Sequence, residues 1–339
     1  MTAQKNPSDT PAYADIVERM QDMLAEDLAA TERLLVERAK SPVDVIPDLS
    51  GYIVSAGGKR LRPMITLIAA QACGGTNPGT HALATAVEFI HTATLLHDDV
   101  VDDSDLRRGK KAAKNVWGNN ASILVGDFLF ARAFTLMVET GNLEILRILS
   151  NASSVIAEGE VHQLAAAART DLPTEEYLAI IEAKTAALFQ AAAEAGALSA
   201  GPEGETHAAD LAAYGKYLGL AFQIVDDVLD YGGTTSVIGK AVGDDFREGK
   251  TTLPVIIARR RGTAEDQAFW DRAMNVSTQT EGDLAHAIHL IRSTGAADAT
   301  VAEAHAYADL AKASLRTLPE SAWTRALADL ADFCVSRVH

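Results

Sequence analysis

The chain has 339 residues, a length that allows two domains of average size. Its formal net charge of −16 argues against a nucleic-acid partner, and its hydrophobic fraction of 48% is ample for a large core. Two cysteines are too few for a disulfide framework and are typical of a reducing, cytoplasmic compartment. No stretch is continuously apolar over the length of a bilayer, so no transmembrane segment is predicted.

Helix signals recur from one end of the chain to the other, after a polar N-terminal segment, 1–10, that is predicted to be frayed. Ser41 followed by Pro42 predicts a helix start. Glycine and proline pairs predict helix ends at Gly74-Gly75, Gly201-Pro202 and Gly232-Gly233. Between these signals the apolar residues recur every three to four positions, and no segment alternates convincingly like a strand. The sequence therefore predicts an all-α fold.

Two aspartate clusters stand out because both lie in strongly apolar sequence, LLHDDVVDDSD and FQIVDDVLDYG. Each cluster has DDxxD spacing, which places its first and last carboxylates one turn apart on a helix. Carboxylates in apolar surroundings are normally paired or bound to a metal. A divalent cation would offset their repulsion. The clusters consist of Asp98, Asp99 and Asp102, and of Asp226, Asp227 and Asp230.

The helix that carries the first cluster combines an acidic end with an apolar remainder. Val87, His91, Thr94 and Asp98 follow one another at helical spacing, which resembles the wall of a pocket with an acidic mouth. Mg²⁺ is usually held by one or two carboxylates together with substrate phosphates. A solvated acidic face is the alternative for one such motif, but it is much less favoured for two. Two acidic helices facing one cavity would require a single domain.

Basic residues flank both clusters. The segment GGKRLRP (57–63) and the pair Arg107-Arg108 accompany the first cluster, and Lys240 and Lys250 follow the second. Arginine binds phosphate bidentately, lysine acts as a point charge, and neighbouring glycines let the backbone approach a polyanion. Each basic group alone would be read as surface solvation. Their pairing with both aspartate clusters favours two diphosphate sites.

Together these motifs closely resemble the trans-polyprenyl diphosphate synthases, most closely the long-chain bacterial type that makes octaprenyl or decaprenyl diphosphate. The resemblance runs from about residue 40 to residue 260 and is most specific in the two DDxxD motifs with GGKRxRP upstream. The matching stretches are GGKRLRP (57–63), EFIHTATLLHDDVVDDSDLRRG (88–109), VGDFLFARAF (125–134), IAEGEVHQL (156–164), KTAALF (184–189), FQIVDDVLDY (222–231) and GDDFREGKTTLPVI (243–256).

The resemblance implies one all-α domain over 11–339, an isoprenoid-synthase-type helical bundle around a deep central cavity. It implies that isopentenyl diphosphate and an allylic diphosphate bind side by side with about three Mg²⁺ ions. The isopentenyl site would comprise Lys59, Arg62, His91 and Arg108, and the allylic site Arg107, Lys184, Thr185, Gln223, Lys240 and Lys250. The principal metal ligands would be Asp98, Asp102 and Asp226, supported by Asp99, Asp227 and Asp230. These aspartates, with Arg107 and Lys184, are the predicted catalytic residues.

The resemblance also implies a product length. In this family, aromatic residues just before the first aspartate cluster stop the chain at C15 or C20. This sequence has Ala93 and Thr94 there, with Ile90 and Val87 deeper along the helix. We therefore expect a C40 to C50 product, made from farnesyl diphosphate for the ubiquinone side chain.

Other readings remain open at this point. A shorter-chain synthase, a class I terpene cyclase and a non-catalytic subunit of a heteromeric synthase all share parts of the pattern. A cyclase normally has a mixed second metal motif, and a silent subunit tends to lose site residues, whereas this chain keeps them. By resemblance we expect a cytoplasmic homodimer, with transient membrane contact for product release.

Overall fold

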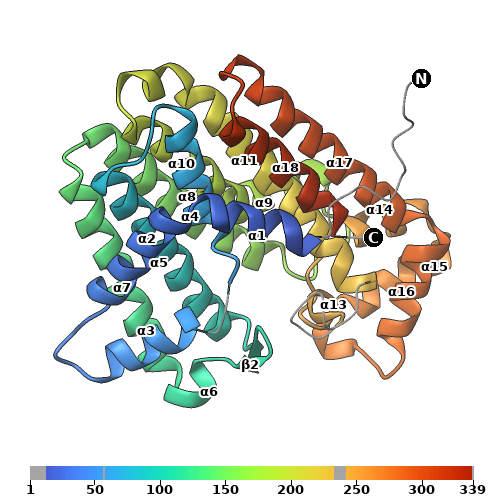
Figure 1. The fold of residues 1–339 in the computed structure, drawn as a ribbon. Helices are drawn as coiled ribbons and strands as arrows, with labels where there is room; N and C mark the ends of the chain where they lie inside the picture. The colour runs from blue at the N-terminus through green and yellow to red at the C-terminus, as the bar shows by residue number, and fades with distance from the viewer. Residues whose placement is uncertain (1–12, 56–57, 233–241, 338–339) are drawn as a thin grey trace, which may run out of the picture.

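The computed structural model describes residues 13–55, 58–232 and 242–337, and helices dominate this part of the chain (Figure 1). Its strands are limited to β1 (Leu106–Arg107) and β2 (Lys110–Lys111), an antiparallel pair directly after the first aspartate cluster. The all-α prediction is therefore confirmed.

The N-terminal half of the described chain contains the helix that carries the first aspartate cluster, α5. Its helices are α1 (Tyr13–Met23), α2 (Ala25–Arg38), α3 (Val45–Ser55), α4 (Leu61–Ala72), α5 (Pro78–Val101), α6 (Lys114–Trp117), α7 (Asn119–Glu139) and α8 (Leu143–Ala166).

The C-terminal half contains one long helix, α11, which carries the second aspartate cluster. Its elements are α9 (Thr174–Ile181), the π-helical turn η1 (Glu182–Ala186), α10 (Ala187–Ser199), α11 (Pro202–Gly232), α13 (Asp244–Arg247), α14 (Leu253–Arg261), α15 (Ala264–Ala273), the 3₁₀ turn η2 (Val276–Thr278), α16 (Asp283–Ser293), α17 (Ala296–Ser314), the 3₁₀ turn η3 (Leu315–Thr317) and α18 (Ala322–Ser336).

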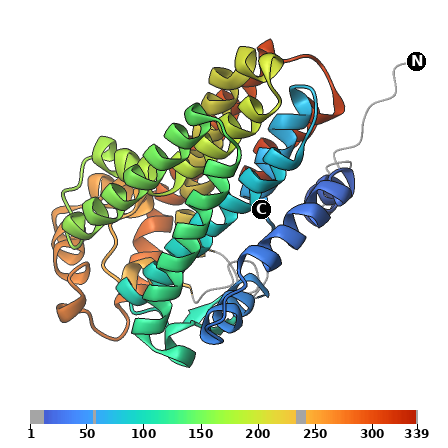
Figure 2. The same ribbon diagram turned by 90° about the vertical axis from the view of Figure 1, so that its left-hand side faces the viewer.

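The bundle is organised around α5, α10 and α11. Helix α5 packs against α2, α4, α7 and α10, whereas α11 packs against α10, α17 and α18. Figure 2 shows the long helices running side by side, and Figure 1 places α15 and α16 on the side opposite α7. The buried core is continuous from Ile16 to Val335.

Small residues bring the central helices unusually close. A Cβ on Gly196 of α10 would lie 2.3 Å from the Thr66 carbonyl oxygen on α4. A Cβ on Gly215 of α11 would lie 2.4 Å from the Phe189 carbonyl oxygen on α10. These contacts leave no room for any other side chain, so the two glycines set the spacing of the helices that carry the site.

Most helix boundaries agree with the sequence signals. Helix α4 ends just before Gly74, and α11 begins at Pro202. The predicted end at Gly232-Gly233 falls at the border of the described residues. The predicted start at Ser41 and Pro42 is wrong, because α3 begins only at Val45. The Ser41 hydroxyl instead accepts a hydrogen bond from the Val43 amide (3.2 Å) and closes a local turn.

One described helix, α7, is long and apolar enough to cross a membrane by length and composition alone. The sequence prediction did not single it out because Asp127 and Arg132 interrupt its apolar residues. One face of α7 packs against α5, and the core helix of a folded protein commonly meets the same criterion.

Candidate active site

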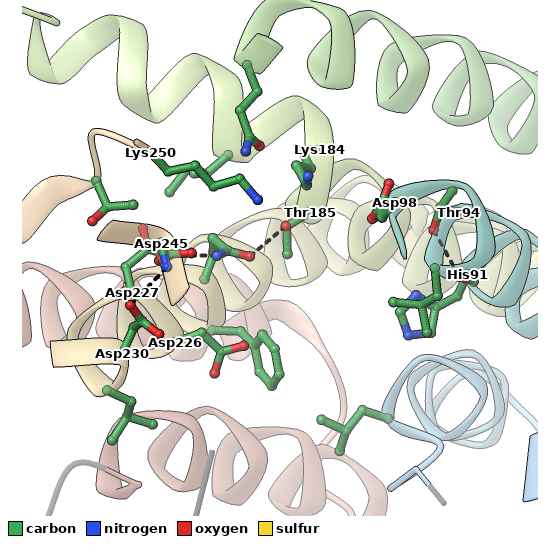
Figure 3. A pocket seen from close by; sticks show the side chains of 18 of the residues that line it. His91, Thr94, Asp98, Lys184, Thr185, Asp226, Asp227, Asp230, Asp245 and Lys250 are labelled. Carbon is green, nitrogen blue, oxygen red and sulfur yellow. Dashed lines mark hydrogen bonds between the residues drawn. The ribbon is translucent and has the colours of Figure 1, made fainter. Parts of the chain in front are cut away.

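A cavity of about 1070 Å³ lies between the two aspartate-bearing helices. Figure 3 shows Asp98 of α5 on one side and Asp226, Asp227 and Asp230 of α11 on the other, with Lys184 and Lys250 between them. The site thus unites segments that are far apart in the sequence, as the resemblance implied. Its predicted roles in catalysis remain proposals.

Asp98 and Asp102, at the end of α5, form what we call the first acidic wall of the cavity. Lysines from distant elements accompany these carboxylates. Lys250 Nζ lies 2.9 Å from Asp102 Oδ2, and Lys184 Nζ donates to Glu160 Oε2 of α8 (2.7 Å). Burial raises the pKa of Asp98, and its neighbour Asp102 adds to that rise while Lys184 opposes it. The lysines thus partly neutralise the acidic residues that face the cavity.

Asp99 differs from the other two aspartates of its cluster because it does not line the cavity. Its carboxylate is completely buried and accepts from Arg107 Nε (2.8 Å). Arg107 itself lines the cavity. Asp99 therefore holds the Arg107 guanidinium in place. Its supporting role at the metal stays a prediction.

The second acidic wall consists of Asp226, Asp227 and Asp230 of α11. Each of these aspartates has a different partner. Arg337, directly after α18, forms an ion pair with Asp226 (2.7 Å between Nη1 and Oδ1). Asp230 accepts the backbone N–H groups of Asp244 and Asp245 (3.2 Å each). Burial, together with the charge of Asp245, raises the pKa of Asp230 to about 8. Asp226 is thus the aspartate of this wall that a cation could reach by displacing one side chain.

Each carboxyl oxygen of Asp227 accepts one side-chain hydrogen bond. The buried Tyr177 hydroxyl of α9 donates to its Oδ2 (2.6 Å), and Gln223 Nε2 donates to its Oδ1 (2.7 Å). The Thr185 hydroxyl in turn donates to Gln223 Oε1 (2.8 Å). Three predicted site residues therefore form one chain of hydrogen bonds that ends on Tyr177, which the sequence analysis did not name.

Lys184 and Thr185 sit in the π-helical turn η1, and both line the cavity. Such turns are rare and occur frequently at functional sites. Gly159 of α8 closes over this turn, since a Cβ there would meet the Lys184 backbone nitrogen at 2.8 Å. The glycine of the IAEGEVHQL stretch therefore permits the close packing that fixes the turn.

The cavity is also lined by a basic group, Lys59, Arg62 and Arg108, together with His91 of α5. Arg62 Nη1 lies 3.1 Å from His91 Nε2, and the Arg62 guanidinium stacks on the Phe189 ring at 4.4 Å. Burial, with Arg62 nearby, holds the pKa of His91 well below its usual range, so the imidazole is neutral at pH 7. A Cβ on Gly58 would lie 2.7 Å from Arg108 Nη1, so Gly58 leaves room for that arginine.

The predicted isopentenyl site also borders residues that the sequence did not mark. Buried Glu88 accepts from Arg60 (2.9 Å) and partly balances Arg62 and Arg108. Arg337 extends the basic group from the C-terminal side. No local motif could have marked Arg337, because its approach depends on how α18 packs against α4 and α11.

The predicted chain-length residues divide into two sets. Thr94 lines the cavity beside Asp98, and its hydroxyl donates to the His91 carbonyl oxygen (2.9 Å). Val87, Ile90 and Ala93 are completely buried in the core below it. Their control of product length stays a prediction. Lys240, assigned to the allylic site, lies outside the described residues.

The donor chemistry of the cavity fits a hard divalent cation. Asp98, Asp102 and Asp226 offer carboxylate oxygens to one shared space, and Mg²⁺ prefers such ligands. Among the described residues, no three acidic, histidine or cysteine side chains form a ready metal cage. This is the arrangement expected when substrate phosphates complete the coordination.

The comparisons with known proteins agree with the fold and with the site. The family model described as Polyprenyl synthetase matches residues 43–291. Octaprenyl diphosphate synthase of Escherichia coli is 44% identical over 95% of this chain and 99% of its own length. The all-trans-nonaprenyl-diphosphate synthase (geranyl-diphosphate specific) of Rhodobacter capsulatus is 41% identical over 94% of this chain and 98% of its own length.

Two solved structures share almost the whole chain. The polyprenyl synthase of Caulobacter crescentus, complexed with calcium and isoprenyl diphosphate, has a TM-score of 0.91 at 53% identity, covering 95% of this chain and 98% of that one. A decaprenyl diphosphate synthase of Rhodobacter capsulatus has a TM-score of 0.90 at 49% identity, covering 95% and 99%. The chain belongs to the polyprenyl synthetase family. Its predicted class, a long-chain trans-prenyltransferase of the polyprenyl diphosphate synthase type, is confirmed.

Proposed function

We propose that the protein elongates farnesyl diphosphate with successive isopentenyl diphosphate units to an all-trans C40 to C50 diphosphate. The observation that carries this proposal is the shared cavity, which is lined by both aspartate motifs and by the basic group that contains Lys59, Arg62 and Arg108. The two acidic walls, together with Lys184 and Lys250, are suited to bind the diphosphate that leaves the allylic substrate. Lys59, Arg62, His91 and Arg108 suit the diphosphate that is retained.

The chemistry follows from the charges of these side chains. Arg107, Lys184 and Lys250 stabilise the diphosphate as the allylic C–O bond breaks. When bound by Asp98, Asp102 and Asp226, Mg²⁺ ions would add Lewis-acid stabilisation of the same leaving group. The double bond of isopentenyl diphosphate attacks C1 of the allylic cation, and the adduct loses a proton to the released diphosphate. The product carries a new allylic diphosphate, so the cycle repeats.

The direct test is a product analysis of the purified protein with Mg²⁺, farnesyl diphosphate and labelled isopentenyl diphosphate, read by mass. A series of products ending near C40 to C50 supports the proposal. A stop at C15 or C20 would keep the enzyme class and favour the shorter-chain alternative. The absence of condensation by this chain alone would favour a subunit that needs a partner.

Lys59→Ala should raise KM for isopentenyl diphosphate by about tenfold or more, because a charge-assisted contact with the retained diphosphate is lost. KM for farnesyl diphosphate should change by less than about twofold, since its diphosphate lies at the acidic walls. Steady-state kinetics with each substrate varied in turn checks this. An equal rise of both constants would mean that the two sites are wrongly divided.

The same lysine should make substrate binding depend on pH. Partial burial and the nearby charge of Arg337 lower the pKa of Lys59 to about 8. The ammonium form therefore predominates below pH 8 and is lost above it, so KM for isopentenyl diphosphate should rise between about pH 7 and pH 9. Lys59→Arg keeps its charge over this range and should flatten the rise. An identical profile for both proteins would contradict the assignment.

We further propose that the protein is a single-domain, cytoplasmic homodimer with a role in ubiquinone synthesis. Helices α7 and α8 pack together, and each exposes large apolar side chains. Leu143 and Val161 of α8 are 80% and 68% exposed and lie five turns apart on one face. Leu124 and Val138 of α7 are 65% and 62% exposed. An apolar stripe of this kind is well suited to bind the same stripe on a second copy.

Charges placed in this stripe should prevent dimer formation. The double variant Leu124→Glu/Val161→Glu should sediment as a monomer at micromolar concentration, because each new carboxylate would lose its water in the interface. Val36→Glu is the matched control, since Val36 is 63% exposed on α2, outside this stripe. Analytical ultracentrifugation of the three proteins measures the mass. A dimeric double variant would show that another surface joins the copies.

A further inference from the structure

Tyr177 has no role in the scheme above, although its hydroxyl reaches the centre of the site. The residue is only 3% exposed, it stands on α9, and it lines the cavity beside Asp227. Its O–H group donates to Asp227 Oδ2 over 2.6 Å. Burying a phenol hydroxyl is favourable only if it finds such a partner, so this contact defines how the ring sits.

The contact matters because Asp227 determines how Gln223 is oriented. A carboxylate accepts hydrogen bonds, whereas a glutamine amide has one donating and one accepting end. In the structure Gln223 turns its NH₂ group towards Asp227 Oδ1, at 2.7 Å, and its oxygen towards the Thr185 hydroxyl, at 2.8 Å. The Thr185 hydroxyl proton is thereby donated to Gln223. The remaining lone pairs of Thr185 Oγ1 and Gln223 Oε1 are available at the cavity wall.

We propose that Tyr177 is a positioning residue that holds the Asp227 carboxylate, and through it the Gln223 amide, so that Gln223 and Thr185 present fixed oxygen atoms to the cavity. This inference rests on the proposed function, in which an electron-deficient allylic carbon forms there. Oxygen dipoles that are already oriented stabilise such a carbon without reorganisation. Asp227 then acts as an anchor for the network, and the metal is left to Asp226 and the first cluster.

The test compares Tyr177→Phe with a matched control. Tyr214 is also completely buried on a neighbouring helix, and its hydroxyl donates to the Leu327 carbonyl oxygen (2.7 Å), away from the cavity lining. Both variants lose one buried hydrogen bond. The rate of the first condensation at saturating substrates, both KM values, the Mg²⁺ concentration for half activation and the melting temperature are measured for the full-length proteins.

Tyr177→Phe should lower the condensation rate about tenfold, with KM for isopentenyl diphosphate and the Mg²⁺ requirement each within about twofold of wild type. Tyr214→Phe should keep the wild-type rate. An unchanged rate for Tyr177→Phe overturns the proposal. So does a loss that excess Mg²⁺ restores, because Tyr177 would then act on a metal ligand. An inactive wild-type protein overturns the proposed function together with this inference.

A second variant covers the case in which Tyr177→Phe is too unstable to assay. Asp227→Asn gives the anchor a donating end, which allows the Gln223 amide to reverse. This variant should lose more activity than Tyr177→Phe, and the double variant should lose no more than Asp227→Asn alone, because both changes act on one network. Losses that multiply would show that Tyr177 works independently of Asp227.

Discussion

Asp98→Ala should lower the turnover number by about a thousandfold or more while the protein stays folded. Asp98 faces the cavity opposite the second aspartate cluster, and we propose that it binds the metal that stabilises the departing diphosphate. The loss of one carboxylate also reduces the repulsion with Asp102, so the variant should melt at or above the wild-type temperature.

Steady-state assays over a range of Mg²⁺ concentrations, together with circular dichroism melting, measure both effects. Asp48→Ala is the matched control, because Asp48 is exposed in the first turn of α3 and does not line the cavity. Near-normal turnover of Asp98→Ala with full metal dependence would show that Asp98 is not a metal ligand in this enzyme.

Ala93→Phe should shorten the product from C40–C50 to about C15–C20, because the new ring would stand about 1.4 turns below Asp98, where we expect the growing chain to pass. Ala93 is completely buried in the core, so the ring must either enter this path or displace its neighbours. Overpacking of this kind costs about 1–3 kcal/mol of stability, which a large core should tolerate.

Mass analysis of the products of wild type, Ala93→Phe and Ala311→Phe checks this prediction. Ala93 and Ala311 are both completely buried outside the cavity lining. Ala93 lies on α5 beside the lining residue Thr94, whereas α17 contributes no lining residue, so Ala311→Phe should be destabilised without a change of product length. An unchanged distribution for Ala93→Phe would mean that another residue sets the length, and Leu95 is the first alternative because it lines the cavity.

Much of the site was predictable because its signals are local. The DDxxD spacing places Asp98 and Asp102 one turn apart on any α-helix, and α5 does bring both to the cavity. The glycine and proline signals marked the end of α4 and the start of α11 for the same reason. The failed prediction at Ser41 is also instructive. Its hydroxyl binds a backbone amide as a cap would, but the chain does not continue as a helix there.

The partners of the site residues could not be predicted in this way. Lys250 reaches Asp102 and Arg337 reaches Asp226 only because separate helices pack side by side. Aspartates at equivalent positions of the two DDxxD motifs also have different environments. Asp99 is buried against Arg107, whereas Asp227 is held by Tyr177 and Gln223.

The helical class, the two acidic motifs and the family to which they belong follow from the sequence, because helical periodicity and short-range spacing are properties of neighbouring residues. Which carboxylates remain open to a cation and which serve as anchors depends on how the helices pack. That division depends on contacts between α9, α11 and α18, and these arise from close packing at glycines and from the burial of polar groups that must find partners.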